Sequence, residues 1–344
     1  MTRFKIALLT GDGIGPEISN SSVAILKTLS EQFHLRLDIR NVEAGDRTLK
    51  RLGKALPQES IDVIETSDVC LKGPVGETAA DVIVKLRQLL DLYANLRPAK
   101  AYPQVSNYRQ GIDLLIVREN TEDLYRGHEF EFDGGAVALR LITKNACSRI
   151  AEYAFRMARE RGLQKRVIAV HKANVLRKTD GLFSRVCREV ASRNVDIDFN
   201  EMYVDAAAMN LIRNPNQFDV LVTTNLYGDI LSDEAAQLVG GLGVAPSANV
   251  GDNFALFEPV HGSAPDIAGK GIANPLAMLL CVKMMMDWWA LKSADESARR
   301  AAEALEDAVL CTLARTRTPD LGGNSSTREV TNSVIRQLKK EPRS

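Results

Sequence analysis

The chain has 344 residues, 45% of them hydrophobic and 26% charged, which fits an ordinary globular protein with two domains or one large one. Lysine plus arginine equals aspartate plus glutamate at 44 each, so there is no basic field that would attract nucleic acid or an anionic membrane. The five scattered cysteines form no C-x-x-C pair, which indicates a reducing compartment and neither a disulfide framework nor a zinc site. No apolar run reaches the ~18 residues that span a bilayer, and there is no signal-peptide pattern, so we expect a cytoplasmic protein.

Short β-rich apolar runs alternate with helical segments along the chain. The first run, Ile6 to Leu9, predicts a strand that stops at a glycine turn, and a helical pattern begins after Pro16. Further strands are predicted at 112–117, 167–170 and 220–222, helices at 81–92 and 294–308, a core helix around 284–289, and a frayed tail at 339–344. The alternation predicts an α/β fold with a largely parallel sheet.

The glycine turn after the first predicted strand lacks the spacing of a dinucleotide fingerprint. Gly11, Gly13 and Gly15 are spaced as G-x-G-x-G, whereas the Rossmann motif is G-x-G-x-x-G. No acidic residue cleanly ends a second strand, where that fold binds the ribose. We therefore expect a tight strand-to-helix turn and no Rossmann domain.

Two carboxylates follow the strand predicted at 220–222. If that strand ends near Thr224 and a helix begins, Asp229 and Asp233 lie one turn apart on one helical face. Like charges at this spacing repel each other, so we expect a cation to bridge them, and a hard divalent metal is the natural candidate. The alternative is a solvated acidic helix start, where aspartate is favoured by capping and by the helix dipole.

Several short motifs occur in a fixed order around this pair. They are GDGIGPE at 11–17, LR at 86–87, DLYANLRP at 91–98, VRENTEDLY at 117–125, HKAN at 171–174 and FEPVHGSAPDIAGK at 257–270. In this order and at these spacings they closely resemble the metal-dependent β-decarboxylating dehydrogenases, a family that includes isopropylmalate, isocitrate, homoisocitrate and tartrate dehydrogenases. The resemblance extends from about Ile6 to Gly323, and the 72–77 loop looks like that of archaeal members of the isopropylmalate branch.

The resemblance implies an isopropylmalate/isocitrate dehydrogenase-like fold, with two α/β domains that share a large mixed sheet. The first, cofactor-side domain would comprise residues 1–99 and 246–344, and the second, dimerisation domain residues 100–245. The region from Phe130 to Leu141, near 128–142, is rich in aromatic and β-branched residues and contains Gly134 and Gly135, so we expect a hairpin there. In the relatives an arm at this place clasps the partner subunit, which implies a homodimer, alone or assembled into a tetramer.

The resemblance also implies a substrate and metal site. Arg87, Arg97 and Arg118 match substrate-binding arginines, and the planar guanidinium is suited to carboxylates. Asp205, Asp229 and Asp233 match the ligands of Mg²⁺ or Mn²⁺. Asp205 and Lys172 are expected to reach into the neighbouring subunit's site, so that each site needs two chains.

The implied reaction is the oxidative decarboxylation of a 2-hydroxy acid with a carboxyl group on its β carbon. The expected catalytic residues are Tyr125, Lys172 and Asp205. Lys172 would accept or relay the hydroxyl proton. A metal acting as Lewis acid would stabilise the enolate left by loss of CO₂, and Tyr125 would protonate that enolate.

The expected cofactor is NAD. Asp266 and Ile267 stand where NADP-using relatives carry a lysine and a tyrosine, and a carboxylate suits two ribose hydroxyls but repels a 2′-phosphate. The residues expected to contact NAD are Asn225, Glu258, His261, Gly262, Ser263, Ala264, Asp266, Ile267 and Asn274.

The helix that carries Arg87 is expected to select the substrate. Ile83 and Val84 share the face of Arg87 and favour an alkyl group over a third carboxylate, which predicts (2R,3S)-3-isopropylmalate and a role in leucine biosynthesis. Lys85 on the same helix, and Ala80 where familiar isopropylmalate enzymes carry a glutamate, leave homoisocitrate or isocitrate as the alternative. A non-catalytic regulatory subunit is a remote alternative, because such chains usually lose a catalytic or metal-binding residue that this chain keeps.

Overall fold

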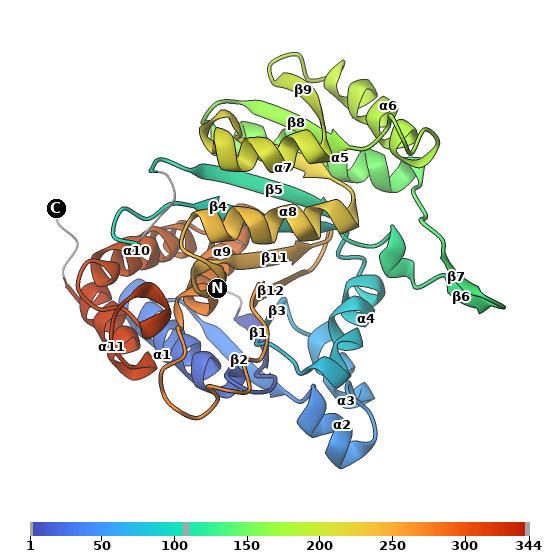
Figure 1. The fold of residues 1–344 in the computed structure, drawn as a ribbon. Coiled ribbons are helices and arrows are strands. Elements are labelled where there is room, and N and C mark those ends of the chain that lie inside the picture. The colour runs from blue at the N-terminus through green and yellow to red at the C-terminus, as the bar shows by residue number, and fades with distance from the viewer. Residues whose placement is uncertain (1–2, 106–109, 341–344) are drawn as a thin grey trace.

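The computed structural model describes residues 3–105 and 110–340, and its framework is one ten-stranded sheet (Figure 1). Across the sheet the strands are ordered β2 (Leu37–Val42), β1 (Phe4–Leu9), β3 (Val69–Lys72), β12 (Ala255–Pro259), β11 (Pro246–Val250), β4 (Ala94–Lys100), β5 (Asp113–Glu119), β10 (Val220–Thr223), β8 (Arg166–His171) and β9 (Asp198–Tyr203). Neighbours are parallel except that β11 is antiparallel to β12 and β4, and β4 to β5. This confirms the predicted α/β fold with a large mixed sheet.

The two faces of the sheet are covered differently. One face carries a continuous apolar cluster under α1 (Gly15–Phe33), α5 (Lys144–Arg161), α6 (Thr179–Ala191), α9 (Leu276–Ser293), α10 (Glu296–Leu313) and α11 (Thr327–Leu338). The other face carries two separate clusters, one under α3 (Gln58–Glu65) and α4 (Asp81–Leu89), the other under α7 (Val204–Arg213) and α8 (Asn225–Leu238). The short helix α2 (Asp46–Leu52) and the 3₁₀ turn η1 (Glu77–Ala79) pack against each other beside the cluster under α3 and α4.

Most predicted elements match the structure to within a few residues, and the differences have local causes. The helix predicted at 81–92 ends at Leu89, and Asp91 adopts a left-handed backbone with φ of 45°, which a helix cannot continue through. The helix predicted at 294–308 begins at Glu296 instead, because Ala294 (φ 51°) ends α9 and the side chain of Asp295 caps α10. The predicted frayed tail lies mostly at 341–344, outside the described residues.

The predicted hairpin is present as a projecting arm (Figure 1). Its strands are β6 (Glu129–Phe132) and β7 (Gly135–Ala138), joined by Asp133 and Gly134. Phe130 and Phe132 are 55% and 56% exposed, although aromatic side chains of this size are usually buried. An isolated two-stranded hairpin is only marginally stable in water, so this arm is suited to packing against another chain.

The proposed division into residues 1–99 with 246–344 and residues 100–245 stays a prediction. The cluster under α3 and α4 lies within residues 1–99 and 246–344, and the cluster under α7 and α8 lies within residues 100–245 apart from Ala99. The continuous cluster extends over both parts, and β4 crosses the boundary between them. No helix in the described part of the chain is long and apolar enough to cross a membrane.

Candidate active site

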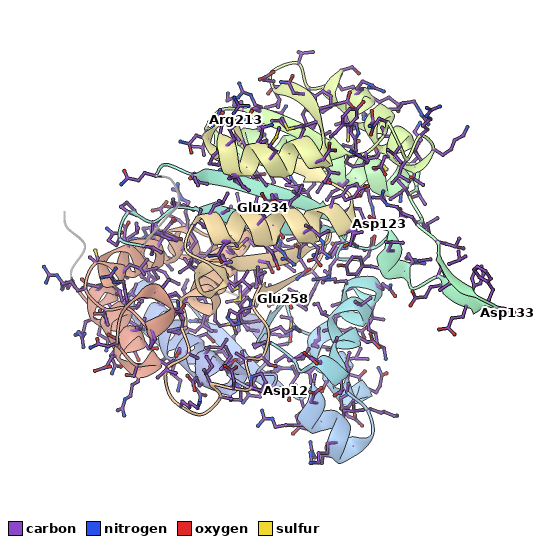
Figure 2. All side chains as sticks on the ribbon, viewed as in Figure 1. Asp12, Asp123, Asp133, Arg213, Glu234 and Glu258 are labelled. Atoms are coloured by element: carbon purple, nitrogen blue, oxygen red, sulfur yellow. The ribbon has the colours of Figure 1, made fainter. Side chains whose placement is uncertain are left out.

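A row of buried polar side chains lies on the sheet face between the two separate clusters. The residues are Lys72 on β3, Glu258 on β12, Asn249 on β11, Asn95 and Arg97 on β4, and Arg118 on β5 (Figure 2 labels Glu258). The preceding residue of each belongs to the continuous cluster on the opposite face, so strand alternation directs these six toward the gap between α4 and α8. Charged groups buried together in this way are rarely tolerated without a partner or a function.

The three predicted substrate arginines come together here, and each is held by an amide or a carboxylate. Arg87 on α4 donates from Nε to Oδ1 of Asn249 (2.9 Å) and from a terminal nitrogen to Glu258 (3.3 Å). Arg97 donates from Nε to Asn95 (2.7 Å). Burial and the neighbouring charge of Arg118 lower the pKa of Arg97 to about 10. Three mutually repelling guanidiniums in a buried site are suited to an anion with more than one carboxylate.

Arg118 is positioned by the start of α8. It donates from Nε and a terminal nitrogen to Oδ1 of Asn225 (2.9 and 2.7 Å) and pairs with Asp229. A Cβ atom on Gly228 would lie 2.5 Å from Cγ of Arg118, so glycine at this helical position lets the arginine stem lie against the helix. Only 1% of the Arg118 side chain is exposed.

The predicted aspartate pair is present, and the cation that bridges it within this chain is an arginine. Strand β10 ends at Thr223 and α8 begins at Asn225, which places Asp229 and Asp233 one turn apart. Arg97 reaches Asp229 at 3.4 Å and Asp233 at 3.3 Å. The aspartate side chains remain 39% and 54% exposed, so their oxygens are accessible to a metal ion. Their participation in metal binding stays a prediction.

The pair's two pKa values are moved in opposite directions. Burial opposes ionisation of Asp229, but the charge of Arg118 and the hydrogen bond from Tyr125 outweigh it and lower the pKa of Asp229. Burial raises the pKa of Asp233, although the charge of Arg97 acts against this. Asp229 is therefore the more strongly anionic member of the pair.

Tyr125 lies beside this pair. It is part of the short 3₁₀ turn η2 (Leu124–Arg126), and its hydroxyl donates to Oδ2 of Asp229 at 2.5 Å. Burial and this hydrogen bond raise the pKa of Tyr125, which keeps the phenol protonated. A protonated phenol at the edge of an arginine cluster can act as a proton donor.

Lys172 and Asp205 pair with each other and not with the α8 aspartates. Lys172 follows β8, Asp205 lies in the first turn of α7, and the two form an ion pair in which the Asp205 side chain is 66% exposed. The hydrogen bond from Lys172 lowers the pKa of Asp205. Within residues 3–105 and 110–340, no three His, Cys, Asp or Glu side chains gather as a metal-binding group. One chain alone therefore does not bring Asp205 to Asp229 and Asp233.

The predicted cofactor residues divide into two groups. Asn225 and Glu258 contact the arginine cluster, whereas the others lie on the segment 261–274. That segment meets the glycine turn: Ile14 donates to the carbonyl of Ser263 (2.9 Å), and a Cβ on Gly13 would lie 1.9 Å from this carbonyl oxygen. This approach explains the glycine turn without a Rossmann domain.

The segment has groups that fit a nucleotide. Burial lowers the pKa of His261, although the hydrogen bond with the Gly262 carbonyl acts against this, so the imidazole is neutral. Its buried Nε2 has no hydrogen-bond partner among the residues that the structure describes. Gly262 and Asp266 are exposed, and Ser263, Ala264 and Ile267 are half-buried. Asn274 is buried and donates to Asp320 (2.9 Å). A buried nitrogen without a partner beside exposed polar groups fits a purine and its ribose.

The sequence interpretation missed Lys72, Asn95 and Asn249. Lys72 donates to Glu258 at 2.7 Å, and Oδ1 of Asn249 accepts from Arg87 and also from Asn95 (2.7 Å). Burial opposes ionisation of Glu258, but the charges of Lys72 and Arg87 lower its pKa to about 2. The available signal was a polar residue in a mostly apolar strand, as Lys72 in VCLK and Asn249 in PSANV.

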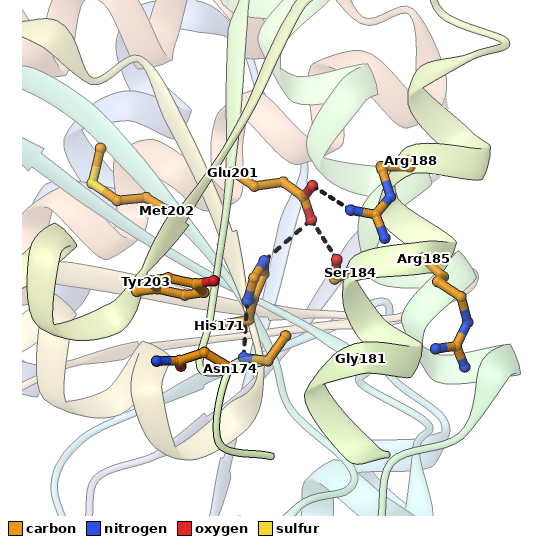
Figure 3. A pocket seen from close by; sticks show the side chains of 10 residues that line it. His171, Asn174, Gly181, Ser184, Arg185, Arg188, Glu201, Met202 and Tyr203 are labelled. Carbon is orange, nitrogen blue, oxygen red and sulfur yellow. Dashed lines mark hydrogen bonds and ion pairs between the residues drawn. The ribbon is translucent and has the colours of Figure 1, made fainter. Parts of the chain in front are cut away.

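A separate pocket lies beside the Lys172 segment (Figure 3). Glu201 accepts hydrogen bonds from Ser184 (2.5 Å), from Arg188 (2.7 Å) and from Nε2 of His171 (3.1 Å). Because serine and histidine both bind the glutamate, the histidine does not activate the serine as a nucleophile. Arg87, Arg97 and Arg118 do not line this pocket.

Comparisons with known proteins agree with this geometry. Residues 5–334 match the family described as isocitrate/isopropylmalate dehydrogenase. A 3-isopropylmalate dehydrogenase of Sulfurisphaera tokodaii is 53% identical over 338 residues, which is 97% of this chain and 99% of that protein. A homoisocitrate dehydrogenase of Methanocaldococcus jannaschii is 42% identical over 354 residues, 98% of each chain. The crystal structure of isocitrate dehydrogenase from Methylococcus capsulatus superposes with a TM-score of 0.91 at 40% identity, covering 98% of this chain and 100% of that chain. The chain therefore belongs to the isocitrate/isopropylmalate dehydrogenase family.

Proposed function

We propose that this chain is an NAD- and Mg²⁺- or Mn²⁺-dependent 3-isopropylmalate dehydrogenase of leucine biosynthesis. It would convert (2R,3S)-3-isopropylmalate to 2-oxoisocaproate and CO₂. The observation that carries the choice of substrate is the apolar side of α4 beside the arginine cluster. The printed name of the Sulfurisphaera tokodaii relative supports the same choice.

The α4 surface next to Arg87 is suited to an alkyl group. Val84 lies one turn before Arg87, is half-buried, and is not a member of the apolar clusters. Ile83 is half-buried against the cluster under α4. Burying an isopropyl group here removes apolar surface from water, whereas a third carboxylate would lose its hydration without a cation on these two side chains.

The residues supply the proton transfers of the reaction. A bound nicotinamide provides the hydride acceptor, and a bound divalent metal provides a Lewis acid for the carbonyl that forms. Lys172 accepts the proton of the C2 hydroxyl group as C2 loses its hydride. The bond between C3 and its carboxylate then breaks, CO₂ leaves, and Tyr125 returns one proton to C3. Arg87, Arg97 and Arg118 hold the two carboxylates of the substrate until the C3 carboxylate leaves as CO₂, and then hold the one that remains.

Each active site is proposed to use two chains of a homodimer. Tyr125 already contacts Asp229, but Lys172 and Asp205 are paired elsewhere in the same chain. A second copy would supply Lys172 and Asp205 to the site, and the exposed aromatic arm is suited to holding that copy. The proposed preference for NAD rests on the exposed carboxylate of Asp266.

The test is NADH formation with Mg²⁺ and isopropylmalate, isocitrate, homoisocitrate or malate at equal concentration. We expect isopropylmalate to react fastest, and the Ile83→Ser, Val84→Arg double variant to shift the preference toward the tricarboxylic acids. If a tricarboxylic acid reacts fastest, the exposed Lys85 would be the group that binds its third carboxylate, and the prediction that α4 selects an alkyl group would be wrong. Inactivity with all four would favour a non-catalytic subunit.

A further inference from the structure

Arg140 lies at the base of the arm, two residues after β7, and is almost enclosed by acceptors. Its guanidinium binds Asp123 twice, through Nε (2.6 Å) and a terminal nitrogen (3.1 Å). It also donates to Asp180 (2.6 Å), to the hydroxyl of Thr224 (2.6 Å) and to the hydroxyl of Tyr227 (3.2 Å). The side chain is 13% exposed, and both aspartates are fully buried. Figure 2 labels Asp123 in this region.

Asp123, the first of the two aspartates that Arg140 binds, holds the segment that carries Tyr125 in place. Asp123 has a left-handed φ of 67°, which is costly for a residue other than glycine. Its Oδ1 accepts from the backbone of Leu124 (3.0 Å), and its Oδ2 accepts from the backbone of Leu226 at the start of α8 (3.1 Å). Its own backbone pairs with Leu141 in an isolated bridge. Asp123 thereby fixes the turn two residues before Tyr125 relative to α8 and to the arm.

Asp180, the second of these aspartates, holds the segment that carries Lys172 in place. Oδ2 of Asp180 accepts from the backbone N–H of Lys172 at 2.6 Å, while Oδ1 accepts from Arg140. One guanidinium thus connects the segments of both proton-transfer residues, which are 47 positions apart by their residue numbers. In the proposed dimer, Tyr125 acts in the chain's own site and Lys172 in the site of the second copy. Through Thr224 and Tyr227, Arg140 also contacts the start of α8. The Arg140 guanidinium lies 4.6 Å from the centre of the Tyr227 ring.

We infer that Arg140 is a positioning residue that sets the Tyr125 and Lys172 segments relative to α8 and joins them to the arm. The inference rests on the proposed function, because it takes Tyr125 and Lys172 as the proton-transfer groups. Only the planar guanidinium can bind Asp123 twice and Asp180 once at the same time, so lysine is a poor substitute. The contact distances leave little freedom, and a displacement of about 1 Å in a catalytic group can cost on the order of 100-fold in rate.

The test compares Arg140→Lys with Arg161→Lys. Arg161 is a matched control, because it also binds two aspartates, is 17% exposed, and pairs with the fully buried Asp219. Arg161 is outside the proposed reaction machinery. The assay uses the fastest substrate of the panel above and measures kcat, KM and the solvent deuterium isotope effect on kcat, with the unfolding midpoint of each variant as a folding check.

We expect Arg140→Lys to lower kcat by about 10- to 100-fold and to raise the isotope effect, because misplaced groups make proton transfer limiting. KM should change by less than about threefold, because Arg87, Arg97 and Arg118 do not contact Arg140. Arg161→Lys should keep kcat and the isotope effect. If Arg140→Lys does not fold, Thr224→Val removes one contact and should give a smaller loss of kcat with the same pattern.

Two outcomes would overturn the inference. One is an unchanged kcat in a folded Arg140→Lys variant. The other is a rise in KM by the same factor by which kcat falls. Tyr125→Phe and Lys172→Met separate this failure from that of the proposed function. If those two variants are inactive while Arg140→Lys is fully active, only the positioning role is wrong. If they retain full activity, the proposed catalytic roles fail, and the inference fails with them.

Discussion

Glu258 is expected to stabilise the fold through the ion pairs it makes inside the sheet face. Its carboxylate lies 2.7 Å from Nζ of Lys72 and 3.3 Å from a terminal nitrogen of Arg87, and it accepts from Asn249 at 2.9 Å. Glu258→Gln keeps the size of the side chain but leaves Lys72, which is 3% exposed, without this carboxylate. A buried cation that loses its counter-ion is strongly unfavourable.

The magnitude follows from the pKa of Glu258. A fall from 4.5 to about 2 corresponds to about 3 kcal/mol of folding free energy, and breaking a buried ion pair typically costs about 3–5 kcal/mol. Because the folded-state pKa is lowered, this contribution is complete above the unfolded value of 4.5 and is lost as the pH falls toward 2. The stability difference between the wild type and Glu258→Gln should therefore be largest at pH 7 and shrink between pH 4.5 and pH 3.

The assay is urea unfolding followed by circular dichroism at several pH values. Protein concentration is kept fixed, because a homodimer's stability depends on it. Glu303→Gln, at an exposed position of α10, is the control and should change stability by less than about 0.5 kcal/mol. A loss below about 1 kcal/mol in Glu258→Gln at pH 7, or a loss that does not depend on pH, would refute the buried-pair argument.

Three further predictions concern the metal, the cofactor and the arm. Asp233→Asn should raise the concentration of Mg²⁺ or Mn²⁺ needed for half-maximal rate by at least about 10-fold, because an anionic oxygen ligand is removed; an unchanged metal titration would argue against this ligand. Asp266→Asn should lower the ratio of kcat/KM for NAD over NADP, since the carboxylate no longer repels a 2′-phosphate; an unchanged ratio would count against the assignment. Phe132→Asp should shift the protein toward monomer in sedimentation velocity, because a charge then replaces an exposed aromatic ring of the arm; a stable dimer would show that the arm does not hold the subunits together.

Local sequence patterns determined the parts of this protein that depend on neighbouring residues. The apolar run at 220–222 and the helix expected after Thr224 placed Asp229 and Asp233 one turn apart, as the structure has them. The hairpin at 129–138 followed from its turn glycines and flanking aromatic residues in the same way. The order of the motifs was sufficient to indicate the family, because those motifs are fixed local segments.

The tertiary structure alone decided which distant residues share the site. Arg97 bridges the two aspartates on α8 from a strand more than 100 positions earlier, and no local pattern indicates that contact. Asn249 joins Arg87 to Asn95 only because β11 inserts between β12 and β4 in the sheet. Arg140 likewise meets Asp123 and Asp180 through the packing of the arm's base. Periodicity specifies which face a side chain takes, but the order of strands in the sheet specifies its neighbours across the chain, and that order is set by the burial of the whole core.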